Sequence, residues 1–405
     1  MSADVKSQER QEVRRVVSAA AVPTLLGVMF INMLGFGIVV PLLPFFGKSF
    51  DAPAWQVALI FSAYSMGAFF GEPFWGRLSD RIGRKPILIS TVVGNCLCYG
   101  ALAFAPNAFA AVLIRFLGGM ASGNGSVVQG YIADVTGDED LTKRMSQLGA
   151  AYNVGFILGP AVGGLLAHPG AGHAGFRIPL LAASALSILC ALALSLFLKE
   201  SRHRMLHHTV QPSRFAVLGN AIRNPVIGRL MLVTLLAGCA FNGIESVFAL
   251  WAQARFQWTP FDVGIAFAVT GVVAAICQIF ITGPLSSRFG QAQMLAVGMA
   301  ITTVCTALQP FSSGAGIIAL LAISAMGQSV AWPNVSAILS RNVDWEHKGQ
   351  YMGLNNATGA LARLLGPQGA SFAFSAIGVD WPFFLAGLSV LPAIFLALST
   401  RSRSD

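Results

Sequence analysis

Hydrophobic runs of roughly 20 residues recur along the whole chain, and this pattern constrains the fold more than any other feature. Each run is long enough to cross a bilayer as a helix and too continuous for the strands of a barrel. Of the 405 residues, 55% are hydrophobic and 11% are charged, whereas soluble domains carry about 25% charged residues. Because backbone groups in lipid must bond within their own segment, the sequence predicts an all-helical membrane protein.

The runs predict twelve transmembrane helices in two six-helix bundles, residues 22–198 and 225–400. A charged linker, 199–224, joins the bundles, and residues 1–21 and 401–405 form terminal tails. The helices are expected at about 22–46, 56–78, 86–105, 108–135, 145–168, 178–198, 225–252, 260–285, 291–311, 313–340, 348–374 and 378–399.

Basic residues fall in alternate loops, so only Lys48, Arg177 and Arg255 lie on the opposite side from the others. This asymmetry predicts that both termini and the linker are cytoplasmic. The net charge of +9 is therefore no sign of nucleic-acid binding. The six cysteines lie in apolar runs and the six histidines in loops or flanks, so no metal site and no cofactor is predicted. The expected partners are the bilayer and a small molecule, and the expected state is a monomer.

The two halves of the sequence repeat each other. The segment Gly76–Gly83 reappears as Gly283–Gly290, and Leu158-Gly159-Pro160 reappears as Leu365-Gly366-Pro367. Both matches have an offset of 207 residues (283 − 76 and 366 − 159). Two matches at one offset indicate a duplicated six-helix unit whose halves run parallel.

A short charged loop, Gly76 to Pro86, separates the second and third apolar runs. Its pattern, G-x-L-x-D-R-x-G-R-K-P, resembles the loop between the second and third helices of the major facilitator superfamily. The resemblance implies a cytoplasmic gate, in which Asp80 meets the start of the eleventh helix and Arg84 pairs with Asp134 at the inner end of the fourth. The alternative is that these charges only fix topology. The gate residues expected here are Gly76, Asp80, Arg81, Gly83, Arg84 and Asp134.

Glycines spaced by four in the fifth run predict a flat stripe for close helix contact. The pattern G-x-x-x-G-P-x-x-G-G also resembles the motif of the antiporter branch of the superfamily, which favours export over uptake. Ordinary small-residue packing is the alternative. The residues of this motif are Gly155, Gly159, Pro160, Gly163 and Gly164.

Four charged residues are candidates for proton coupling. Glu245 is an acid placed well inside a span, where burial disfavours the charged form and permits proton exchange near neutral pH. Arg115 and Arg363 are intramembrane arginines, either of which could pair with Glu245. The alternatives are a static salt bridge at Glu245 and a snorkelling Arg115 near the outer interface. Glu72, one turn before Gly76, is a second candidate acid that could instead support the gate.

The expected function is export of small organic molecules in exchange for protons, by alternating access across the inner membrane of a bacterium. The first helix resembles that of drug/proton antiporters, especially tetracycline exporters, but Asn32 stands where those exporters carry an acid. The alternatives are an exporter or uniporter of an organic anion, a carrier of lipid-like molecules, or a membrane sensor; no feature predicts an enzyme. The residues expected to line the cavity are Asn32, Phe36, Ser122, Ser126, Gln129, Phe241, Asn242, Gln328, Trp332 and Asn356.

Overall fold

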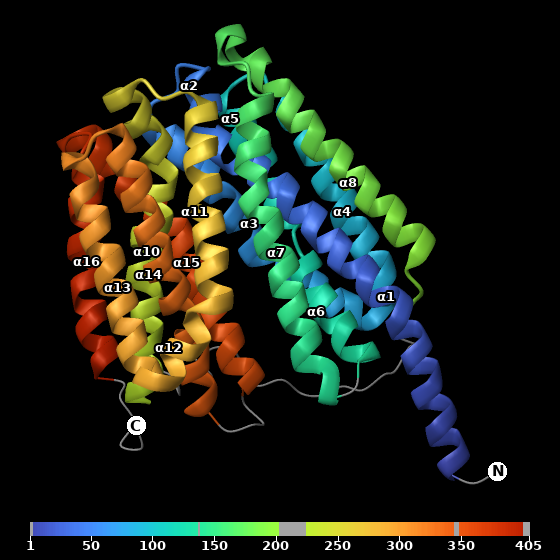
Figure 1. Cartoon of the computed structure of the whole chain (residues 1–405). Coiled ribbons are helices and arrows are strands. Elements are labelled where there is room, and N and C mark those ends of the chain that lie inside the picture. Colours follow the sequence, from blue (N-terminus) through green and yellow to red (C-terminus); the bar gives the residue numbers. More distant parts are fainter. Residues whose placement is uncertain (1–2, 137, 202–223, 344–347, 400–405) are drawn as a thin grey trace. The chain divides into compact units, whose positions relative to one another are not determined.

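The computed structural model describes residues 3–136, 138–201, 224–343 and 348–399, and this part of the chain is helical, with no β-strand (Figure 1). Most of the predicted linker and the tail 401–405 therefore lie outside the described residues. The principal helices are α1 (Ala3–Val39), α2 (Leu43–Lys48), α3 (Ala54–Ile82), α4 (Arg84–Ala103), α5 (Ala108–Ala121), α6 (Asn124–Val135), α7 (Asp138–Leu166), α8 (Arg177–Phe197), α10 (Pro225–Phe256), α11 (Pro260–Phe280), α12 (Thr282–Phe289), α13 (Gln291–Leu308), α14 (Gly314–Arg341), α15 (Lys348–Phe372) and α16 (Trp381–Leu398).

Within the described residues, eleven helical segments are long and apolar enough to cross a membrane. Each coincides with a hydrophobic run expected from the sequence. The α15 helix is 25 residues long but is not among the eleven, because it carries Arg363 and a polar stretch around Asn355 and Asn356. The protein is thus a multi-pass membrane protein.

The chain divides into two compact units. Unit 1 comprises Met1–Val40 and Met66–His208, and unit 2 comprises Pro41–Ser65 and Thr209–Asp405. The boundary near residue 208 falls in the predicted linker. The inclusion of Pro41–Ser65 in unit 2 differs from the predicted bundle 22–198.

Local packing explains why Pro41–Ser65 belongs to unit 2. The α2 helix packs on α10, and the Lys48 Nζ donates a hydrogen bond to the Gln253 Oε1 at 3.0 Å. Between α15 and α3, the Gln368 Nε2 donates a hydrogen bond to the Ser62 Oγ at 2.7 Å. Polar contacts of this kind between distant segments leave no pattern in a single sequence.

The predicted fourth helix is interrupted. The α5 and α6 helices meet at Ser122 and Gly123, where the backbone leaves the helical region. The Trp75 indole of α3 lies against this break, and its Nε1 donates to the Met120 carbonyl oxygen at 2.7 Å. A Cβ atom at Gly123 would lie 2.6 Å from the Trp75 Cβ, so glycine makes room for the indole. An inserted side chain at a Ser-Gly pair is an established cause of such helix breaks.

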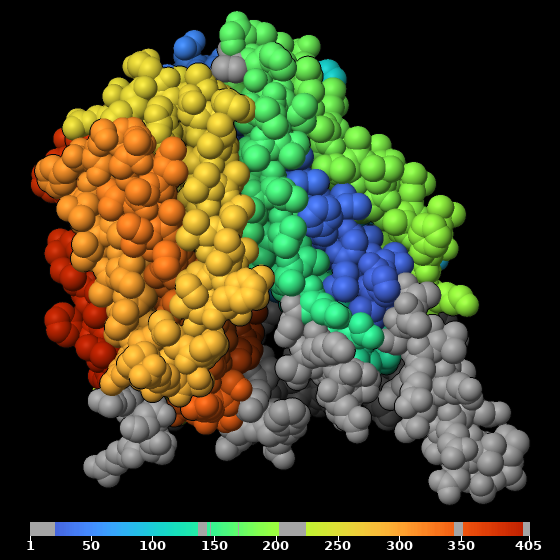
Figure 2. Space-filling model, viewed as in Figure 1, coloured from blue at the N-terminus to red at the C-terminus, as the bar shows by residue number. Residues whose placement is uncertain are grey.

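The core of each unit lies among its helices. In unit 1 a cluster of buried apolar side chains is shared by α1, α4, α6 and α8, and includes Leu25, Leu88 and Tyr131. In unit 2 an equivalent cluster is shared by α10, α13, α14 and α16. The α11 and α13 helices, yellow and orange in Figure 2, also expose apolar residues such as Ile276 and Val304. Exposed apolar faces of this kind are expected of helices that contact lipid.

The duplication predicted from the sequence is visible in the backbone. Gly83 ends α3 with φ 108° and ψ 160°, and Gly290 ends α12 with φ 84° and ψ 151°. Their separation equals the repeat offset (290 − 83 = 207). Positive φ favours glycine because other residues place a Cβ against the backbone, so both copies require glycine at this point.

Candidate functional site

Close helix contacts in each unit are built on the predicted glycine stripe and its repeat. In unit 1, a Cβ atom at Gly159 of α7 would lie 2.5 Å from the Gly37 Cα of α1. In unit 2, a Cβ atom at Gly366 of α15 would lie 3.0 Å from the Gly243 backbone nitrogen of α10. These separations allow no side chain, so the glycines set the distance between the helices.

The other members of the stripe behave in the same way. A Cβ at Gly163 would lie 2.5 Å from the Ile38 carbonyl oxygen, and a Cβ at Gly155 would collide with the Phe30 carbonyl oxygen. Pro160 and Gly164 are buried in the same helix. The packing role of this stripe is thus evident, whereas its link to antiport stays a prediction.

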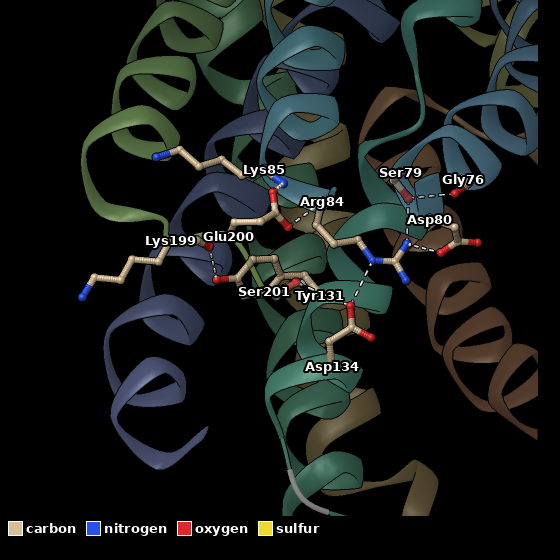
Figure 3. A network of polar contacts seen from close by, with 10 residues as sticks. All are labelled: Gly76, Ser79, Asp80, Arg84, Lys85, Tyr131, Asp134, Lys199, Glu200 and Ser201. Carbon is tan, nitrogen blue, oxygen red and sulfur yellow. Dashed lines mark hydrogen bonds and ion pairs between the residues drawn. The ribbon is translucent and has the colours of Figure 1, made fainter. Parts of the chain in front are cut away.

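A polar network at the junction of α3 and α4 is centred on Arg84 (Figure 3). The guanidinium Nε lies 3.1 Å from the Asp134 Oδ2 of α6, and Nη1 lies 3.0 Å from the Asp80 Oδ1 and 2.7 Å from the Ser79 Oγ. The side chain of Arg84 is 11% exposed, that of Asp134 24% and that of Asp80 52%. The ion pair expected between Arg84 and Asp134 is therefore present, and it is the more buried of the two pairs.

Glycines shape the space around this arginine. A Cβ at Gly130 of α6 would lie 2.7 Å from the Arg84 Cζ, so only glycine admits the guanidinium there. Gly76 approaches α6 as well, since its Cβ would lie 3.9 Å from the Ser126 Oγ. Arg81 is exposed at the end of α3. The expected contact of Asp80 with the start of the eleventh helix would join the two units and stays a prediction.

Glu200 is a member of the network that sequence reasoning missed. Its carboxylate accepts hydrogen bonds from the backbone N–H groups of Arg84 at 2.8 Å and Lys85 at 3.0 Å, as Figure 3 shows. These are the first two N–H groups of α4, which have no partner within the helix, and an anion is favourable at a helix N-terminus. Its charged surroundings in the sequence are typical of a loop, so the pattern predicts a linker position for Glu200.

The segment that follows α8 is tied to the network at further points. The Tyr131 hydroxyl donates to the Lys199 carbonyl oxygen at 2.5 Å, the Lys85 Nζ donates to the Ser195 carbonyl oxygen at 2.8 Å, and the Ser201 Oγ donates to Asp134. The end of α8 and the start of the predicted linker are thus attached to α4 and α6, two of the helices that contribute to the Arg84 network.

The second copy of this loop lacks the network. Ser286 corresponds to Ser79 (286 − 79 = 207), but its Oγ accepts from the Asn334 Nδ2 at 2.9 Å and not from an arginine. The residue corresponding to Asp134 is Arg341 (341 − 134 = 207). The two loops share a backbone conformation and differ in charge, so the described part of unit 2 has no counterpart of the Arg84–Asp134 ion pair.

Arg115 lies inside unit 1. It is 4% exposed and acts electrostatically on Cys98 of α4. Burial at this level does not fit a side chain that snorkels to an outer interface. Ser122, expected on the same face, is buried at the helix break, whereas Ser126 and Gln129 of α6 are exposed.

The remaining unit 1 candidates occupy different environments. Asn32 of α1 is 8% exposed. Phe36 is half-buried, with its ring centroid 6.3 Å from that of Phe156. Glu72 of α3 is exposed. Of the predicted cavity residues in this unit, Ser126, Gln129 and Phe36 have accessible side chains.

Glu245 and Arg363 come together in unit 2. Glu245 is partly buried in α10, and Arg363 is exposed on α15. Arg363 acts electrostatically on Glu245, and among the described residues no hydrogen bond joins the two side chains. Glu245 lies 20 residues after the start of α10 and 11 before its end, or about 30 Å and 17 Å along the axis. It is therefore well inside the span, as predicted.

The other predicted cavity residues of unit 2 are partly accessible. Asn242 is half-buried and donates to the Gly238 carbonyl oxygen at 2.6 Å, while the Gln328 Nε2 donates to the Ser324 Oγ at 3.4 Å. Trp332 is half-buried, and Phe241 and Asn356 are exposed. Unit 2 therefore supplies polar, aromatic and charged side chains to one region around α10, α14 and α15.

Comparison with known proteins identifies the family. A family model described as Major Facilitator Superfamily matches residues 25–278 and 230–405. The class G tetracycline resistance protein of Vibrio anguillarum is 31% identical over 87% of this chain and 89% of its own length. Multidrug resistance protein 2 of Bacillus subtilis is 25% identical over 94% of this chain and 95% of its own length.

Solved structures share the fold. The human organic anion transporter MFSD10 superposes with a TM-score of 0.70 and 22% identity, covering 94% of this chain and 99% of its own. A bacterial homolog of the human lysosomal transporter Spinster superposes with a TM-score of 0.77 and 16% identity, covering 94% and 96%. At these identities the likeness concerns the fold alone.

Proposed function

Because this chain belongs to the major facilitator superfamily, a family of transporters and not of enzymes, we propose that it exports small organic molecules in exchange for protons. Membership of that family makes it a membrane transporter of small molecules. Export is supported by relatives whose names describe tetracycline and multidrug resistance. The glycine stripe of α7 is a second support, through its resemblance to the antiporter motif.

The proposed topology has twelve spans, in which α15 is added to the eleven long apolar segments. Its polar residues are acceptable in a span that contributes to a hydrated cavity. A duplicated unit of six spans returns the chain to the side on which it began, so both termini share one side. The excess of basic residues in the loops of that side supports a cytoplasmic location for it. The resistance proteins among the relatives are bacterial, and the proposed location is the inner membrane of a bacterium.

Glu245 is the residue that carries the proposed coupling. It is a carboxylic acid deep in a span, with Arg363 as the charged neighbour that acts on it. An ionisable residue at such depth marks an ion pathway by default. Protonation removes the attraction between Glu245 and Arg363, which changes how α10 and α15 interact. Glu72 is the second candidate, and its place one turn before Gly76 connects it to the gate loop.

The Arg84 network acts as a gate that stabilises one conformation of unit 1. Alternating access requires contacts that are made in one state and released in another. The exposed Asp80 is the member best placed to exchange partners, because Arg84 retains Asp134 when Asp80 leaves. No energy source other than a proton gradient and no cofactor is proposed.

An organic anion carrier is the second candidate function. It would be favoured by two arginines exposed to one ligand. Arg363 is exposed, but Arg115 is buried within unit 1 beside α4. With one accessible arginine beside an acid, we place proton-coupled export first.

Proton release from detergent-purified protein tests this proposal. A panel of cationic, neutral and anionic compounds is added at fixed pH in weak buffer, and released protons are counted. The wild type should release protons on binding its substrates, and Glu245→Gln should bind them without release. If no binding compound releases protons from the wild type, antiport at this site is wrong.

A further inference from the structure

Unit 2 presents two opposite charges that do not neutralise each other by direct contact. Glu245 and Arg363 lie on α10 and α15, two helices held together by Gly243 and Gly366. A Thr234–Asn355 hydrogen bond of 2.8 Å joins the same helices further down. The two helices are therefore in close contact, and among the described residues no hydrogen bond or ion pair joins the two charged side chains.

Arg363 lies near the middle of its span. It lies 15 residues after the start of α15 and 9 before its end, about 22 Å and 13 Å along the axis. Its side chain is exposed at this depth, and a guanidinium in contact with lipid tails would be costly. Gly359, one turn earlier, adds no side chain to cover it, since a Cβ there would meet only the guanidinium at 3.7 Å.

Aromatic side chains adjoin the charges. Phe241, one turn before Glu245 on α10, is 39% exposed. The Trp332 ring of α14 reaches the contact between α10 and α15, because its Cη2 would lie 4.0 Å from a Cβ at Gly238. Asn356 shares the exposed face of Arg363, two turns earlier. The region thus offers an anion, a cation, an amide and two aromatic surfaces.

We propose that this region binds amphiphilic zwitterions, in which an ammonium group meets Glu245, a carboxylate meets Arg363 and an apolar body lies on Phe241 and Trp332. A simple anion would gain from Arg363 but be repelled by the nearby carboxylate of Glu245. A simple cation would gain from Glu245 but be repelled by Arg363. At short range and reduced dielectric each such repulsion weakens binding, so a ligand that carries both charges is favoured over a ligand that carries one.

This inference rests on the proposed function, because an ammonium group and a proton compete for the same carboxylate. That competition is what exchange of substrate for protons requires. A ligand with only an acidic group would instead bind better when Glu245 is protonated. Such a ligand and the proton would then be transported in the same direction. The zwitterion is therefore the ligand class that agrees with both the charges and the direction of transport.

Equilibrium binding of four probes on one aromatic body tests the proposal. The probes are 2-naphthylalanine, its methyl ester, its N-acetyl derivative and its N-acetyl amide, which are respectively a zwitterion, a cation, an anion and neutral. Calorimetry on detergent-purified wild type should give the zwitterion at least a tenfold advantage over each other probe. In Arg363→Gln the zwitterion should no longer bind more tightly than the methyl ester. In Glu245→Gln it should no longer bind more tightly than the N-acetyl derivative.

Controls make the result specific to the two charges. Arg363→Lys should retain part of the preference, and Arg288→Gln, which removes a charge at the end of α12, should retain all of it. Equal affinities for the four probes, no binding of any, or a preference unchanged in both Gln variants would overturn the proposal. The binding measurement involves no proton gradient, so its result is independent of the proton-release experiment. Proton release can fail while the zwitterion preference holds, and the preference can fail while proton release is observed.

Discussion

The Arg84 guanidinium of α4 lies 3.1 Å from the Asp134 carboxylate of α6. This ion pair joins two helices through residues that are 50 positions apart in the sequence. Both side chains are largely buried. Asp80, in contrast, reaches the same guanidinium from an exposed position, with 52% of its side chain accessible. One arginine therefore has a largely buried partner and an exposed one.

Asp134→Asn should lower stability far more than Asp80→Asn. Loss of one member of a buried ion pair costs up to about 3–5 kcal/mol, whereas an exposed pair is worth about 0–1 kcal/mol. Melting temperatures of the purified variants compare the two. Equal shifts for both variants would show that the Asp134 pair has no special role in the structure.

Gly83→Ala should be more harmful than Gly290→Ala. Both glycines have positive φ, so alanine is strained by roughly 1–2 kcal/mol at either position. At Gly83 the new Cβ would also lie 2.6 Å from the Glu200 carboxylate, while at Gly290 it would meet nothing within 4 Å. Thermal unfolding measures the difference, which should shrink when Glu200→Ala is added. A difference that survives this second substitution would contradict the role of Glu200.

Alanine at Gly159 or Gly366 should separate the helices that these glycines join. The added Cβ would lie 2.5 Å from backbone atoms of the neighbouring helix in each case, and overpacking costs about 1–3 kcal/mol or more. Gly149→Ala and Gly369→Ala are matched controls on the same helices, where a Cβ meets nothing within 4 Å. Yield and melting temperature should fall for the first pair only.

Trp75→Phe should destabilise unit 1 by about 1–2 kcal/mol, because it leaves the Met120 carbonyl without its donor at the break between α5 and α6. Trp55→Phe, in the same helix at a 48% exposed position, should change stability by less than about 0.5 kcal/mol. Chemical denaturation in detergent compares them. An equal response would mean that the indole bond does not support the break.

Local patterns predicted much of this molecule. Apolar runs located the spans, and the offset of 207 predicted the matching backbones at Gly83 and Gly290. The Arg84–Asp134 pair followed from a family resemblance. What could not be predicted depends on contacts between distant segments: the Trp75 indole that enters a break 45 residues later, the Glu200 carboxylate that caps a helix 115 residues earlier, and the bond between Ser62 and Gln368. Arg115 is a further example. Helical periodicity places it on a polar face, but its burial beside α4 depends on packing between helices that a single sequence does not show.

The most direct test of the central claim is transport driven by an imposed pH gradient in vesicles that contain the purified protein. The substrate is whichever panel compound binds the wild type. Wild-type vesicles should accumulate it against its concentration gradient. Glu245→Gln vesicles should still exchange labelled for unlabelled compound but should not concentrate it. Gradient-driven accumulation at the wild-type level in Glu245→Gln would contradict a coupling role for this residue.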